Sequence, residues 1–249
     1  MIRNNQPSRF RQLAYDLTEG TGPGVVFLGG FRSDKEGNKA LHLEEWAQRR
    51  GRNFLHFDYS GHGQSQGNFE DGCVGDWAED AAAIIANLTD GPQLLVGSSM
   101  GGWIALLLAR EMPDRVGGLV TIAAAPDFTE DGIWASLDAG KKQKLDRDGC
   151  IELDSEYSSE PTIITQRLIE DGRKHLVLRS PLSVSCPARF LQGTGDVDVP
   201  VSVALRLLNH VNGDDIRLTL VKNADHRFSD PECLALIVHA IEEVSARMT

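Results

Sequence analysis

The chain has 249 residues, of which 41% are hydrophobic and 24% are charged, and its formal net charge is −11. This composition is typical of a folded globular protein and argues against a disordered chain. No apolar run approaches the ~20 residues that a membrane span needs. A negative net charge disfavours a nucleic-acid partner, because binding phosphates requires a basic surface.

The four cysteines, Cys73, Cys150, Cys186 and Cys233, are widely spaced and form no CxxC pair. The sequence therefore predicts no zinc site, and we expect free thiols in a reducing compartment. The first fifteen residues contain three arginines and no acidic residue, which is a weak feature of transit peptides. They contain no apolar segment, however, so we expect a cytoplasmic location.

Short apolar runs alternate with segments of helical periodicity along the chain. An antiparallel strand is possible at 15–19. It is followed by a strand at 24–30, a helix at 38–50, a strand at 53–59, a helix at 74–88, a strand at 93–96, a helix at 101–110 and a strand at 118–123. After a long gap come a strand at 187–192, a helix at 201–210, a strand at 216–221 and a helix at 231–247. Strands separated by helices predict a mostly parallel, doubly wound α/β sheet with helices on both faces.

The gap between the strands near Ala124 and Ala188 is too long for a plain crossover. It is highly charged and has no clear strand pattern, with helical patches around 133–142 and 162–169. We interpret residues 126–182 as a lid inserted into one core domain formed by 1–125 and 183–249. The alternative is a decorated crossover with no functional role.

A GxSxG pattern occurs twice, around Ser65 and around Ser99. A nucleophilic serine of this kind lies on a sharp turn between a buried strand and a helix. Ser99 has that context, because an apolar strand precedes it and an apolar helix follows it. Ser65 lies in a turn-rich stretch that is neither strand nor helix, so we predict Ser99 as the nucleophile.

A serine nucleophile needs a histidine base and an acid that orients it, in the chain order Ser, acid, His. Asp196 follows a late strand directly and is the predicted acid, with Asp198 as the second choice. His226 follows the last strand and is the predicted base. The backbone N–H groups of Phe31 and Met100 are the predicted oxyanion-hole donors.

Two further residues are weaker candidates for contact with the substrate. His62 lies in a glycine-rich loop near the expected site, where a structural turn is the alternative. Trp134, with Ile133 and Leu137, forms an apolar face that we expect over the pocket, and the alternative is a core tryptophan.

Five motifs occur in an order that resembles the α/β-hydrolase superfamily: LGGF at 28–31, FDYSGHGQS at 57–65, GSSMGG at 97–102, GTGDVDVP at 193–200 and DHRF at 225–228. The segments GGFRSDKEGNKA at 29–40 and SPLSVSCPARFLQG at 180–193 are similar to the small-lidded hydrolases related to the mammalian mitochondrial acyl-protein thioesterase. That group is described as depalmitoylases and acyl-glucuronide esterases. The resemblance implies an α/β-hydrolase fold with a short helical lid. Gln192 stands where the superfamily often has a histidine.

Together these features predict a serine hydrolase that cleaves carboxylic esters or thioesters through an acyl-enzyme, with a small-molecule or acyl-protein substrate. No metal and no organic cofactor is implied. The alternatives are an amidase or peptidase with the same triad and, in a different class, a non-catalytic ligand-binding protein on a hydrolase scaffold.

Overall fold

A computed structural model describes residues 8–10, 12–154 and 161–248. Within these ranges the central sheet has eight strands: β1 (Ser8–Phe10), β2 (Leu13–Thr18), β3 (Thr21–Leu28), β4 (Arg52–Phe57), β5 (Gln93–Ser98), β6 (Val116–Ile122), β10 (Ala188–Gly193) and β12 (Ile216–Val221). Their order is β1-β2-β4-β3-β5-β6-β10-β12. The pairs β1–β2 and β2–β4 are antiparallel, and the strands from β4 to β12 pair in parallel. The mostly parallel α/β sheet expected from the sequence is therefore confirmed.

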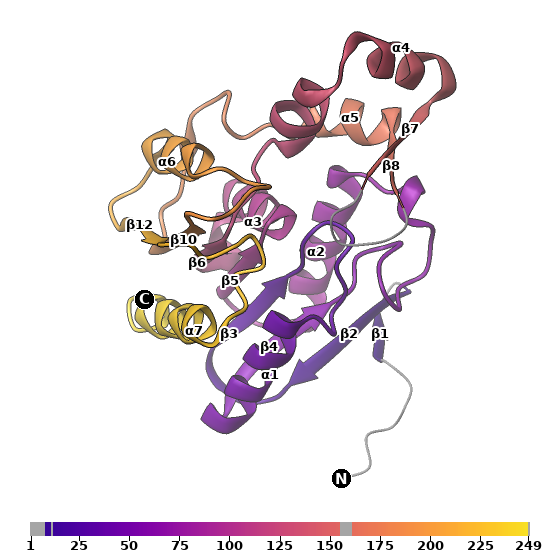
Figure 1. Ribbon diagram of the computed structural model, residues 1–249. Coiled ribbons are helices and arrows are strands. Elements are labelled where there is room, and N and C mark those ends of the chain that lie inside the picture. The colour runs from indigo at the N-terminus through magenta and orange to yellow at the C-terminus, as the bar shows by residue number, and fades with distance from the viewer. Residues whose placement is uncertain (1–7, 11, 155–160, 249) are drawn as a thin grey trace.

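Helices cover both faces of this sheet (Figure 1). On one face lie α1 (Asn38–Arg50) and α7 (Pro231–Ser245), whose apolar side chains share a core with β3, β5 and β6. On the other face lie α2 (Val74–Leu88), α3 (Met100–Glu111) and α6 (Val201–His210). All six residues of β5 are buried, because a central parallel strand is covered on both sides.

The predicted elements of the sheet domain are present. The helices at 38–50, 74–88 and 201–210 and the strand at 216–221 have the predicted bounds, and the bounds of other elements differ by a few residues. The possible strand at 15–19 is β2, which pairs antiparallel with β4 and begins two residues earlier. The strand predicted at 24–30 begins at Thr21 and ends at Leu28, so Gly29 and Gly30 belong to the following loop.

The segment between β6 and β10 contains a π-helical turn η3 (Thr129–Trp134), α4 (Ala139–Asp148), β7 (Cys150–Leu153), β8 (Thr162–Thr165) and α5 (Gln166–Gly172). The sequence shows no clear strand pattern in this segment, but β7 and β8 pair as an antiparallel hairpin. The helical patch predicted at 162–169 begins only at Gln166, since Thr162, Ile163, Ile164 and Thr165 are the residues that form β8. The patch predicted at 133–142 is interrupted before Ala139. Two-residue strands β9 (Leu182–Ser183) and β11 (Val211–Asn212) follow.

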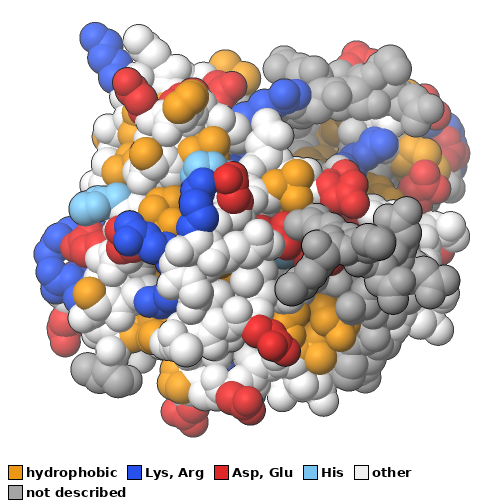
Figure 2. Space-filling model, turned by 90° about the horizontal axis from the view of Figure 1, so that it is seen from below, with side chains coloured by type: hydrophobic (Ala, Val, Ile, Leu, Met, Phe, Trp, Pro, Cys, Tyr) orange, Lys and Arg blue, Asp and Glu red, His pale blue; other side chains and the backbone are white. Residues whose placement is uncertain are grey.

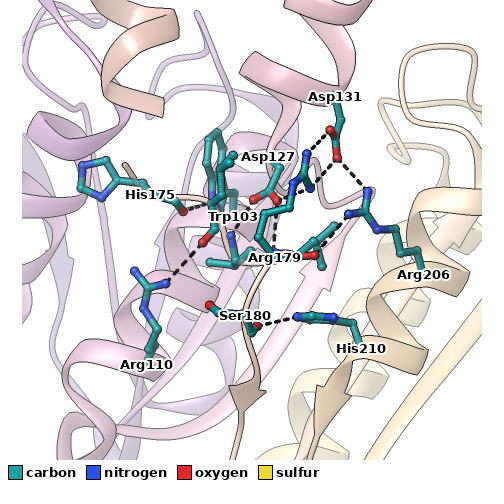
Figure 3. A network of polar contacts seen from close by, with 12 residues as sticks. Trp103, Arg110, Asp127, Asp131, His175, Arg179, Ser180, Arg206 and His210 are labelled. Atoms are coloured by element: carbon teal, nitrogen blue, oxygen red, sulfur yellow. Dashed lines mark hydrogen bonds and ion pairs between the residues drawn. The ribbon is translucent and has the colours of Figure 1, made fainter. Parts of the chain in front are cut away.

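The two ends of this segment are joined by a polar network around Asp127 (Figure 3). The buried Asp127 carboxylate accepts hydrogen bonds from the backbone N–H groups of Val177 and Leu178 and from the side chain of Arg179. Arg179 also pairs with Asp131. Because a buried carboxylate needs such donors, the network holds the return of the segment against its beginning.

The surface carries charges of both signs. On the face seen in Figure 2, acidic, basic and hydrophobic side chains are interspersed, and Lys and Arg form no continuous patch. Within the described ranges, no helix is long and apolar enough to cross a membrane.

Candidate active site

Ser99 occupies a sharp turn between β5 and α3. Its backbone has φ 54° and ψ −117°, a conformation that is uncommon for a residue with a side chain. The Ser99 N–H donates to the carbonyl of Ile122 in β6, and its own carbonyl accepts from Ala125 N. These bonds to the neighbouring strand fix the strained turn, and such strain is typical of functional residues.

Glycines allow the strand and the helix to approach closely at this turn. A Cβ atom on Gly97 would lie 2.3 Å from the carbonyl oxygen of Gly101, and one on Gly101 would lie 2.0 Å from the carbonyl oxygen of Leu28. Both distances are below van der Waals contact. Glycine is therefore required by packing at positions 97 and 101 of the GSSMGG motif, which is why the context of Ser99 in the sequence is informative.

The structure brings Ser99, His226 and Asp196 together, although they lie in loops far apart in the sequence. The His226 Nε2 atom is 3.1 Å from Ser99 Oγ. The His226 Nδ1 atom is 2.9 Å from Asp196 Oδ2. Each residue follows a different strand of the sheet, and parallel strands bring their carboxyl ends to one edge. This geometry permits a proton to pass from the serine to a histidine whose ring is oriented by a carboxylate.

The Asp196 carboxylate is buried and accepts several hydrogen bonds. Besides the contact with His226, Oδ2 accepts from Gln192 Nε2 at 2.9 Å, and Oδ1 accepts from the backbone N–H groups of Asp198 and Val199. Burial favours the neutral acid, but the bonds from His226, Val199 and Gln192 outweigh it, so that the pKa of Asp196 lies below its usual value. Asp196 is therefore held as a carboxylate.

Asp198, the second choice for the acid, contributes its backbone N–H to Asp196. Among the described residues, the one group of side chains close enough together to hold a metal ion is Asp196, Asp198 and His226. Two of these three already bind each other in the arrangement above, and the Asp196 oxygens accept four hydrogen bonds. The donor set therefore suits the orientation of a histidine better than the coordination of an ion.

Phe31 and Met100, the predicted oxyanion-hole residues, flank Ser99. A Cβ atom on Gly30 would lie 3.4 Å from Cβ of Ser99, so the loop after β3 passes directly beside the serine. Met100 is the first residue of α3, where backbone N–H groups have no partner within the helix. In the described part of the chain, neither the Phe31 nor the Met100 N–H has a protein acceptor. Met100 follows Ser99 directly and Phe31 follows Gly30, so both residues lie next to the serine in the structure.

A cavity of about 890 Å³ opens over Ser99 and His226. Its apolar lining includes Phe31, Phe128, Ile133 and Leu153, the last three of which belong to the segment between β6 and β10. Its polar lining includes Lys39, whose pKa burial lowers to about 8 against the opposing effect of nearby Asp225. The cavity has the size and the mixed lining of a small-molecule site.

Two sequence-based candidates lie elsewhere. Trp134 is not among the lining residues. The cationic groups of Lys142 and Arg173 lie over its ring, 5.0 and 4.6 Å from the centroid, and the neighbouring Ile133 lines the cavity instead. The expectation that Trp134 lines the pocket was wrong.

His62 is only 3% exposed and also lies outside the cavity lining. It packs against the rings of Tyr59, Phe69 and Trp77, and burial lowers its pKa to about 4. These surroundings therefore support a structural role for His62 in the turn and not contact with the substrate. Ser65 has a similar role, since its hydroxyl donates to the Asp58 carbonyl and accepts from Ala14 N.

Gln192 also belongs to the site, although the sequence shows it only as a departure from the histidine that the superfamily often has at this position. Its side chain, 1% exposed, donates to Asp196 and to the carbonyl of Val199, and it thereby connects the end of β10 to the acid loop.

Comparison with known proteins agrees with this geometry. Residues 26–148 match a family model described as the alpha/beta hydrolase fold. The chain is 36% identical over 238 residues to proteins from Bos taurus and Homo sapiens named "Palmitoyl-protein thioesterase ABHD10, mitochondrial". The aligned region covers 95% of this chain and 78% of each relative.

Two solved structures are similar over nearly the whole length. One, from Agrobacterium vitis S4 and described as a "Putative hydrolase", has a TM-score of 0.90 and 40% identity, covering 98% of this chain and 97% of that one. The other, alpha/beta hydrolase domain-containing protein 10 from mouse, has a TM-score of 0.88 and 33% identity, covering 100% and 98%. The curated relatives are named as mitochondrial, so the expected cytoplasmic location is not confirmed.

Proposed function

The chain belongs to the α/β-hydrolase family and hydrolyses esters or thioesters, and we propose that it does so through an acyl-enzyme formed on Ser99. The observation that carries the proposal is the contact of Ser99 Oγ with His226 Nε2, made on a strained turn and backed by Asp196. In the first step Ser99 Oγ attacks the acyl carbon and His226 takes the hydroxyl proton. His226 then gives that proton to the leaving oxygen or sulfur.

The second step reverses these roles with water. His226 removes a proton from a water molecule, whose oxygen attacks the acyl carbon, and the proton returns to Ser99 as the acid product leaves. In both steps the negative oxygen is stabilised by the N–H groups of Phe31 and Met100. Asp196 keeps the imidazole oriented and stabilises its positive charge, which its lowered pKa supports.

We propose an acyl chain of medium or long length as the group that Ser99 accepts. The cavity is about 890 Å³, and the segment between β6 and β10 contributes Phe128, Ile133 and Leu153 to its apolar lining. This supports the interpretation of residues 126–182 as a lid over a core of 1–125 and 183–249. The names of the curated relatives, which specify palmitoyl-protein thioesterases, favour thioesters.

The test is a series of acyl esters from C2 to C16, each offered as an oxygen ester and as a thioester. The proposal expects kcat/KM to rise with chain length and a transient acyl adduct on Ser99 in the intact-mass spectrum. Turnover retained by Ser99→Ala, with no covalent adduct in the wild type, would contradict the acyl-enzyme.

The cellular location stays a proposal. All four cysteines are free, which supports a reducing compartment such as the cytoplasm. Fractionation of source cells, with the protein detected by antibody, distinguishes a cytoplasmic from an organellar pool.

A further inference from the structure

The loop after β3 makes a turn whose third residue carries a strained backbone. The Ser33 N–H donates to the Gly30 carbonyl at 3.1 Å, which closes a four-residue turn over Phe31 and Arg32. Arg32 has φ 58°. Turns with a positive φ at the third position usually have glycine or asparagine there, because a Cβ atom disfavours that conformation. An arginine at this position needs interactions that hold it.

The side chain of Arg32 supplies such interactions. Its Nη1 atom donates to the carbonyl of Pro161 and to the hydroxyl of Thr162, each at 3.1 Å, at the beginning of β8. Its guanidinium also lies over the ring of Phe69 in the short helix η1 (Phe69–Asp71), 5.6 Å from the centroid. Arg32 thus connects the turn to two segments distant in sequence.

The neighbouring Phe31 is held by the same surroundings. Its ring makes edge contacts with Phe69 at 4.8 Å, with Phe128 at 5.5 Å and with Trp77 at 5.9 Å. Phe128 and Thr162 both belong to the segment between β6 and β10. The residue that offers an N–H beside Ser99 is therefore positioned by contacts from that segment, through its own ring and through Arg32.

The far end of the loop is fixed separately. The Lys35 N–H donates to Oδ1 of the buried Asp58, at 2.6 Å, and Asp58 Oδ2 accepts from Gln64 N. The loop is thus anchored at Lys35 by the sheet domain and at Arg32 by the hairpin. Loss of the Arg32 contacts would change the turn at 30–33 without releasing the rest of the loop.

We propose that Arg32 is a positioning residue for the reaction: its bonds to Pro161 and Thr162 hold the strained turn that places the Phe31 N–H in the oxyanion hole. The inference rests on the proposed function, in which that N–H stabilises the tetrahedral intermediate. It also gives the hairpin β7–β8 a role in catalysis besides covering the cavity. Because removal of one oxyanion donor costs about 10²–10³-fold in rate, a displaced donor has a measurable effect.

The experiment compares Arg32→Ala, Arg32→Lys and Arg32→Gly with Arg49→Ala, which removes an exposed arginine paired only with Glu45 on α1 among the described residues. The readouts are kcat and KM on an ester and the affinity of a trifluoromethyl ketone. The ketone adds to Ser99 Oγ and presents an oxyanion to the hole while His226 takes the serine proton. A thermal melting curve of each variant reports folding.

We expect Arg32→Ala to lower kcat and the ketone affinity together by about tenfold, with KM changed by less than about twofold. Arg32→Lys retains part of the activity, because an ammonium can still donate to the Pro161 carbonyl. Arg32→Gly is less impaired than Arg32→Ala, since glycine adopts the positive φ without strain. A residue with only a structural role would lower the melting temperature and leave kcat and the ketone affinity of the folded enzyme unchanged.

The inference is overturned if Arg32→Ala matches Arg49→Ala in kcat and ketone affinity, or if Arg32→Gly is no better than Arg32→Ala. Either result leaves the proposed function intact when the wild type is active. A wild type that turns over neither esters nor thioesters overturns the proposed function, and this inference with it.

Discussion

Gln192 donates a hydrogen bond to the same oxygen of Asp196 that accepts from His226. The Nε2–Oδ2 distance is 2.9 Å, and the amide also bonds to the Val199 carbonyl. Hydrogen bonds to a charged group contribute about 1.5–3 kcal/mol, so this contact stabilises the ionised acid and fixes its loop.

Replacing Gln192 by Met should therefore reduce kcat/KM by about tenfold, the equivalent of ~1.4 kcal/mol. The pKa of Asp196 lies below its usual value partly through this bond. Its loss raises that pKa, so we expect the acid limb of the pH profile to move to higher pH. Gln192→His, which restores a ring N–H donor, is the matched control. An unchanged profile in Gln192→Met would show that Asp196 needs no such support.

The choice between the two GxSxG serines gives a second prediction. Ser99→Ala should abolish fluorophosphonate labelling and lower turnover by several orders of magnitude. Ser65→Ala should leave labelling intact and cost about 1–2 kcal/mol of unfolding free energy, because its hydroxyl bonds to Asp58 O and Ala14 N are lost. Intact labelling of Ser99→Ala would assign the nucleophile elsewhere.

Substitutions of Asp196 and of Asp198 should differ strongly in their effect on turnover. Asp196→Asn leaves the wrong imidazole tautomer and should reduce kcat by about 10⁴-fold. Asp198→Asn keeps the backbone N–H that bonds to Asp196, so its effect should be at most a few-fold. The measurement is steady-state kinetics on one p-nitrophenyl ester, and similar effects of both substitutions would refute the assignment.

Acyl-chain selectivity should depend on Ile133 and not on Trp134. Ile133 lines the cavity. Its truncation to Ala removes about three carbon atoms of apolar contact, worth roughly 1–2 kcal/mol, and should lower the ratio of kcat/KM for C10 and C2 esters by about tenfold. Trp134→Ala, the control, should leave that ratio unchanged. A changed ratio in Trp134→Ala alone would contradict this assignment of the two residues.

Stability should fall on acidification partly through His62. Burial lowers the pKa of His62 from 6.5 to about 4. Since the folded state disfavours the charged form, this histidine contributes stability that is present above pH 6.5 and is lost as the pH falls toward 4. The shift corresponds to roughly 3 kcal/mol. Urea unfolding at pH 7.5 and 4.5 should show a smaller loss for His62→Phe than for wild type, whereas an equal loss would place the effect in other groups.

The sequence by itself determined the order of strands and helices, and with it the edge where the functional residues meet. Apolar runs of strand length alternate with helix-period segments, and this pattern permits few arrangements. Ser99, Asp196 and His226 could be chosen because each follows a predicted strand, and carboxyl ends of parallel strands share one edge. The glycines around Ser99 also indicate the sharp turn between strand and helix, because only glycine allows the close packing there.

Only the tertiary structure decided what surrounds that edge. The positions of Trp134 and His62 depend on the rotation of a π-helical turn and on packing against distant rings, which no local periodicity encodes. The hairpin β7–β8 escaped prediction because two short, partly exposed strands have no strong alternation. The contacts of Gln192 with Asp196 and of Arg32 with Pro161 depend on the direction of the side chains and on the conformation of the loops. Both are set only when the chain folds, so the sequence pattern does not show these contacts.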